Sequence, residues 1–121
     1  MTFKPAIPIL RIFDEAKVIE FYVEYLGFSV DWQHRFGEDF PIYQSVSLGG
    51  CVLHLSEHHG DCSPGSAVRI ETDDVFALRE ALHGKDYKYA KPGVQRQPWG
   101  ANEMSITDPF GNRLIFYTPV A

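Results

Sequence analysis

The chain has 121 residues, a length typical of one domain that buries most of its surface. Its net charge of −5 argues against nucleic acid as the main partner, because phosphate binding needs a basic surface, and it favours a cationic ligand. No apolar run approaches the roughly 20 residues of a membrane span, so we expect no membrane partner. The N-terminus MTFKPAIPIL lacks a signal-peptide pattern, which predicts a cytoplasmic protein.

The first half of the chain predicts a strand, a helix and three further strands. The strand spans 6–13, and Asp14 is a plausible N-cap for a helix that runs through Leu26 and ends at Gly27. Strands are then predicted over 28–36, 42–48 and 51–56. Alternation in the first of these places one set of residues on a single face: Phe28, Val30, Trp32, His34 and Phe36.

The same order of elements recurs after a polar loop at 58–65. A strand over 67–72 precedes a helix that begins after Asp73 or Asp74 and ends near Gly84. An irregular strand over 87–97 leads to a hairpin, 102–107 and 113–117, around the turn DPFGN. The sequence therefore predicts a single α+β domain over 1–121, with one βαβββ module at about 1–60 and a second at about 65–121.

Two motifs give this repeated order a specific resemblance. The segments EFY (20–22) and LGF (26–28) in the first module, with DPFGN (108–112) in the second, resemble the vicinal oxygen chelate superfamily of glyoxalases, dioxygenases and bleomycin-resistance proteins. The segments AIPI (6–9), LGFSVDW (26–32) and QPWG (97–100) lean towards its bleomycin-resistance and glyoxalase-like members. The resemblance implies a cupped mixed sheet and a homodimer in which the N-terminal strand can be exchanged.

The resemblance also implies four metal-ligand positions, which fall at Ile7, His54, Ala67 and Ile115. Only His54 can coordinate, and a catalytic cation needs about three protein ligands. We therefore expect no metal, no other cofactor and a binding protein rather than an enzyme. The alternative is a lyase or dioxygenase with a non-standard metal site drawn from these neighbouring residues: His54, Glu57, His58, His59 and Asp61. The same stretch also fits an exposed polar loop end.

Two tryptophans carry the functional prediction. Trp32 and Trp99 match positions where bleomycin-resistance proteins stack aromatic side chains on the flat part of the drug, although a loop tryptophan can equally be a packing residue. We predict sequestration of a flat, cationic antibiotic such as bleomycin, with an unrelated metabolite as the alternative ligand. Arg69 and Glu71 could instead form ion pairs near strand ends. The candidate ligand-binding residues are Trp32, Phe36, Phe40, Tyr43, His54, Arg69, Trp99, Arg113 and Tyr117.

Overall fold

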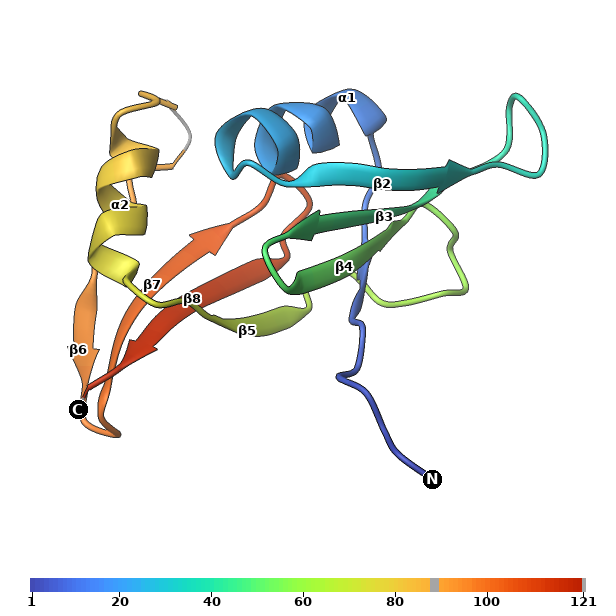
Figure 1. The fold of residues 1–121 in the computed structure, drawn as a ribbon. Helices are drawn as coiled ribbons and strands as arrows, with labels where there is room; N and C mark the ends of the chain where they lie inside the picture. The colour runs from blue at the N-terminus through green and yellow to red at the C-terminus, as the bar shows by residue number, and fades with distance from the viewer. Residues whose placement is uncertain (88–89, 121) are drawn as a thin grey trace.

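The computed structural model describes residues 1–87 and 90–120, in which the strands form two four-stranded sheets (Figure 1). Sheet A has the order β1-β4-β3-β2 and sheet B the order β5-β8-β7-β6. The bounds in sheet A are β1 (Ile9–Arg11), β2 (Ser29–His34), β3 (Tyr43–Leu48) and β4 (Cys51–Ser56). Those in sheet B are β5 (Ala67–Glu71), β6 (Gln95–Gln97), β7 (Ala101–Thr107) and β8 (Arg113–Pro119). The pairs β1–β4 and β5–β8 are parallel, and the other strand pairs are antiparallel. This arrangement of strands and helices confirms the predicted α+β fold.

Each sheet packs one face against a helix and leaves the other face open. Helix α1 (Glu15–Val18), continued by η1 (Ile19–Tyr25), lies over sheet A, and α2 (Val75–His83) lies beside sheet B (Figure 1). Alternating strand residues make the core between sheets and helices: Leu10, Leu53, Leu55, Met104, Leu114 and Phe116. The residues between them in sequence point to the opposite side of each sheet. We call that side the open face.

The first predicted strand is shorter than expected. The sequence predicted a strand over 6–13, but β1 covers Ile9–Arg11 and residues 1–8 extend away from the body (Figure 1). Proline has no N–H to donate, and Pro8 contributes only its carbonyl, which accepts from the backbone N–H of His54 at 3.0 Å. The predicted strand over 87–97 is likewise shorter, with β6 at Gln95–Gln97, and residues 88–89 of that prediction lie outside the described residues.

The first predicted helix begins as expected but does not stay α-helical. The Asp14 carboxylate accepts from the backbone N–H of Lys17 at 3.2 Å, which confirms the N-cap. After Val18 the chain becomes a π-helix, in which Leu26 N–H donates to the Phe21 carbonyl five residues back, at 2.9 Å. A π-helix shifts the direction of later side chains relative to an α-helix and is often found at functional positions.

The shared parity predicted for 28–36 is wrong at one point. The register pairs Val30 with Val46 and then Trp32 with Ser45, so Asp31 is the extra residue of a β-bulge. Val30 therefore lies opposite the buried Val46, whereas Trp32 and His34 lie on the open face. The bulge arises in the pairing of two strands, which the alternation of one strand cannot reveal.

The two motifs that carried the family resemblance contact each other directly. The Tyr22 hydroxyl, at the π-helix, donates to Asp108 Oδ2 at 2.6 Å. Asp108 also accepts from the backbone N–H groups of Phe110 and Asn112, both at 2.8 Å. Asn112 then donates through Nδ2 to the Arg11 carbonyl at 2.7 Å. This buried network joins the first module to the turn of the second and stabilises their packing.

Candidate ligand-binding site

Three rings meet on the open face of sheet A. Trp32 on β2 stacks on Tyr43 of β3, with ring centroids 5.8 Å apart and planes 13° from parallel. His54 on β4 meets Trp32 edge-on at 5.2 Å, and its Nδ1 lies 2.6 Å from the Tyr43 hydroxyl oxygen. The Trp32 side chain remains 47% exposed. These three residues form the A cluster, an aromatic surface that one face of a flat ligand could cover.

The tyrosine of the A cluster keeps its proton. Burial, followed by the nearby Asp61 and Cys62, raises the pKa of Tyr43 above its ordinary value. The protonated Tyr43 hydroxyl can donate to Nδ1 of His54, and in that arrangement Nε2 of the same ring carries an N–H. The pair therefore offers a hydrogen-bond donor beside the stacked rings.

A cavity of about 410 Å³ adjoins the A cluster. Its lining is Trp32, His34, Phe36, Tyr43, His58 and Asp61. The Phe36 ring meets His34 edge-on at 4.6 Å. Two carboxylates lie at this face, because Asp61 accepts from Ser56 at 2.7 Å and Asp31 accepts from Ser47 at 2.8 Å. Aromatic walls, with one carboxylate in the lining and a second on the same face of the sheet, suit a flat ligand that carries positive charge.

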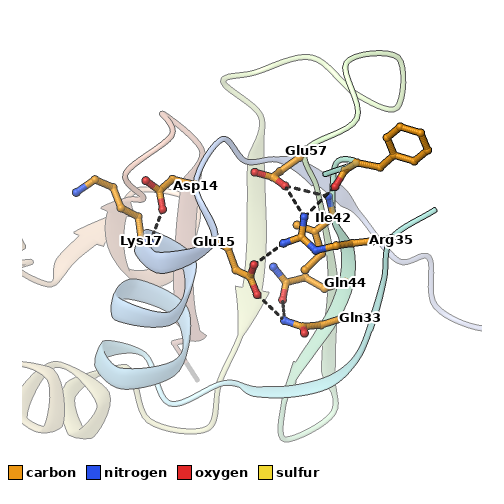
Figure 2. A network of polar contacts seen from close by, with 9 residues as sticks. Asp14, Glu15, Lys17, Gln33, Arg35, Ile42, Gln44 and Glu57 are labelled. Atoms are coloured by element: carbon orange, nitrogen blue, oxygen red, sulfur yellow. Dashed lines mark hydrogen bonds and ion pairs between the residues drawn. The ribbon is translucent and has the colours of Figure 1, made fainter. Parts of the chain in front are cut away.

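A polar network on the helix side of sheet A supports the loop after β2 (Figure 2). Arg35 donates to Glu15 Oε2 of α1 at 2.5 Å and to the Phe40 carbonyl at 2.8 Å. Glu57 accepts from the backbone N–H of Ile42 at 2.9 Å. The network holds the ends of the loop that carries Phe36 and Phe40. Phe40, a predicted ligand-binding residue, lines a different cavity from that of Trp32, together with Arg11 and Phe13.

The open face of sheet B carries a second group, which we call the B cluster: Arg69, Trp99, Glu103 and Tyr117. Glu103 Oε2 accepts from Arg69 Nη2 at 2.8 Å and from Trp99 Nε1 at 2.6 Å. The Arg69 guanidinium lies 4.3 Å above the centroid of the Tyr117 ring. Hydrogen bonds from Arg69 and Trp99 lower the pKa of Glu103 below its ordinary value, so this carboxylate stays ionised.

The structure thus gathers most of the predicted residues into two separate groups, and leaves Phe40 and Arg113 outside both. Trp32 belongs to sheet A and Trp99 to the turn between β6 and β7, and these elements lie on opposite sides of the molecule (Figure 1). Arg113 is exposed at the start of β8, opposite Ala67 and Thr107, away from Tyr117 at the other end of the strand. Sequence reasoning missed Glu103 and Asp31 as site residues. Alternation along the strand did place Glu103 and Met104 on different faces of the sheet, but no local signal linked Glu103 to Trp99.

The histidine-rich stretch does not converge. His54 belongs to the A cluster, Glu57 accepts from the backbone N–H of Ile42, His58 lines the cavity and His59 is exposed. Within residues 1–87 and 90–120, no three His, Cys, Asp or Glu side chains are placed to hold a metal ion. The absence of a bound metal stays a prediction.

The register adds two neighbours to the implied metal-ligand positions. Ile9 lies opposite His54, and Arg69 lies opposite Ile115. Neither isoleucine nor arginine coordinates a cation, so the argument from these positions is unchanged.

The whole chain, residues 1–121, matches the family model described as glyoxalase superfamily protein, and the chain belongs to that family. A comparison with curated proteins found no match. The described helices lack the length and apolar character needed to cross a bilayer.

Solved structures similar to this chain include binding proteins and an enzyme-related protein. A bleomycin-binding protein in complex with bleomycin is 20% identical, with a TM-score of 0.73 over 96% of this chain and 98% of that one. TnmS3, an antibiotic-binding protein from Streptomyces sp. CB03234, is 24% identical, with a TM-score of 0.74 over 98% of each chain. A glyoxalase-related enzyme from Clostridium phytofermentans is also 24% identical, with a TM-score of 0.78 over 99% of this chain and 98% of that one. At these identities the similarity establishes the shared fold.

Proposed function

We propose that this protein binds a flat, conjugated, cationic small molecule, with bleomycin as the model ligand, and holds it without chemical change. The observation that carries the proposal is the half-exposed Trp32 ring, stacked on Tyr43 beside a cavity with aromatic walls. Asp61 in the cavity lining, Asp31 on the same face of sheet A and the net charge of −5 favour a cation. The similarity in fold to two antibiotic-binding proteins supports the same ligand class.

Binding of this kind would protect a cell by sequestration in the cytoplasm. One protein molecule would remove one ligand molecule, so the dissociation rate, rather than a chemical step, would set its effectiveness. Stacking alone contributes about 0.5–1.5 kcal/mol for each ring pair, so two tryptophans would supply a useful share of the affinity.

The proposed groove needs two copies of the chain. Within one chain, Trp32 on β2 and Trp99 in the β6–β7 turn lie on opposite sides of the molecule (Figure 1), whereas the open face of sheet A in one copy facing that of sheet B in another would bring them together. Apolar side chains exposed near the N-terminus favour such an association, because Phe3 is 89% and Ile7 46% exposed. Sedimentation analysis tests this: a monomer at tens of micromolar protein would contradict the two-chain groove.

Ligand binding is tested by titration with metal-free bleomycin, followed by tryptophan fluorescence and calorimetry, with and without EDTA. We expect saturable binding at about one ligand per chain that EDTA does not change. Trp32→Ala should weaken the affinity for bleomycin by about twofold to twelvefold, the loss that corresponds to the stacking energy of one ring pair. Phe76→Ala is the matched control, because this ring is 53% exposed on α2, away from both open faces. The absence of binding, or equal affinity in both variants, would refute the proposal.

A further inference from the structure

Glu103 occupies an uncommon position for a carboxylate. Its side chain is 8% exposed, on the middle strand pair of sheet B, and a buried acid is unfavourable unless its charge is compensated. Compensation comes from two donors on different elements, Arg69 of β5 and the indole N–H of Trp99 in the β6–β7 turn. Both donate to the same oxygen, Oε2.

In contrast to the buried Glu103, Trp99 is a large apolar residue that is 65% exposed. An exposed indole on a turn can occupy several rotamers, and fixing one of them on binding reduces affinity. The 2.6 Å bond to Glu103 fixes the edge of the ring that carries the N–H. Most of the indole surface then stays available for stacking.

We infer that Glu103 is a positioning residue: held by Arg69, its carboxylate orients the Trp99 indole for ligand stacking on the open face of sheet B. This inference rests on the proposed function. The support continues through the sheet, because Arg69 lies over the Tyr117 ring, and the Tyr117 hydroxyl donates to Glu71 at 3.3 Å. The register places Tyr117 on β8 directly opposite both Glu71 and Glu103. The indole is therefore tied to three strands before any ligand arrives.

The charges around Glu103 give the inference a pH signature. Arg69 faces it from β5, Tyr117 faces it from β8, and the residue opposite on β6 is the neutral Gln95. Arg69 lowers the pKa of Glu103, so the charged contact with Trp99 persists as the pH falls below the ordinary range of a glutamate and weakens when the carboxylate takes a proton. Removal of Arg69 should move that weakening to higher pH.

The first arm of the test uses ligand-free protein in a Trp32→Phe background, so that Trp99 alone emits. We expect Glu103→Leu to increase fast local motion in the fluorescence anisotropy decay. Glu103→Gln, which keeps one oxygen acceptor, should restore part of the slow component. An acid titration of Trp99 emission should show a higher midpoint in Arg69→Met than with Arg69 present. Unchanged anisotropy in Glu103→Leu, or equal midpoints, would overturn the inference.

The second arm measures affinity for metal-free bleomycin by calorimetry in protein with both tryptophans. Loss of a hydrogen bond to a charged group, with loss of the prepared rotamer, predicts about tenfold weaker binding in Glu103→Leu and a smaller loss in Glu103→Gln. Glu80→Gln is the matched control, an exposed glutamate paired with Arg79 on α2. Equal affinity in Glu103→Leu and wild type would overturn the inference. If wild type itself fails to bind, the proposed function falls, and the anisotropy and pH results still decide whether Glu103 orients Trp99.

Discussion

The contact between the two modules predicts a measurable loss of stability on Tyr22→Phe. The Tyr22 side chain is fully buried and its hydroxyl donates to Asp108 Oδ2 at 2.6 Å. Phenylalanine fills the same space, so the substitution removes the hydrogen bond without opening a cavity. Hydrogen bonds to charged groups contribute about 1.5–3 kcal/mol. Asp108 keeps its donors from Phe110 and Asn112, so we expect a loss of about 2 kcal/mol in the free energy of unfolding.

The same contact predicts how that loss depends on pH. Burial first, then the charge and hydrogen bond of Asp108, raise the pKa of Tyr22 far above its ordinary value. A group with a raised pKa in the folded state contributes its full stability below its unfolded pKa, about 10 for tyrosine. Above that pH the unfolded chain ionises while the folded chain does not, so the contribution falls by about 1.4 kcal/mol per pH unit. The phenylalanine variant lacks this loss, and the difference between the two proteins should shrink above about pH 10.

The assay is urea unfolding followed by circular dichroism at one fixed protein concentration, at about pH 7 and between about pH 9.5 and 11, a range that brackets the ordinary tyrosine pKa. Tyr25→Phe is the matched control, because this tyrosine is similarly buried but donates to a neutral carbonyl, that of Ala90, at 3.4 Å. We expect the control to lose less than about 1 kcal/mol at neutral pH. A loss below about 0.5 kcal/mol in Tyr22→Phe, or a difference from wild type that is constant with pH, would refute the reasoning.

Three further outcomes are expected. Arg35→Met should lower the free energy of unfolding by about 0.5–1 kcal/mol, because its ion pair with Glu15 is partly exposed. It should also speed hydrogen exchange in the loop 36–41, which Arg35 contacts at the Phe40 carbonyl (Figure 2). Arg79→Met, which removes an exposed pair on α2, is the control, and unchanged exchange in the loop would contradict the expectation. Trp99→Ala should lose most of the affinity for bleomycin while circular dichroism stays the same; full affinity would remove Trp99 from the groove. Elemental analysis should find no stoichiometric Zn, Mn, Ni or Fe, and about one ion per chain would instead favour a metal-dependent lyase or dioxygenase.

The elements that were predicted well have local causes. The strand at 51–56 agrees with β4 at both ends, because the apolar alternation and the Gly49-Gly50 turn lie within or next to the segment itself. Asp74 caps α2 by accepting from Phe76 and Ala77, both at 3.1 Å, through a contact of two or three residues in sequence. The predictions of elements that failed concern the lengths of β1 and β6, the bulge at Asp31 and the π-helix. Strand length and the bulge depend on pairing with a partner strand, and the spacing of apolar residues predicts a helix without distinguishing its π form.

The sequence by itself determined the order of elements, the family and the face on which most candidate side chains lie. Alternation along one strand is a local property, so it suffices to assign Arg69 and Tyr117 to one side of sheet B. Only the tertiary structure decided which side chains meet: the bulge brings Trp32 onto Tyr43, and strand register brings Glu103 between Arg69 and Trp99. These contacts join residues from separate strands and turns, and their energies depend on how strands pair in space, which no single segment encodes.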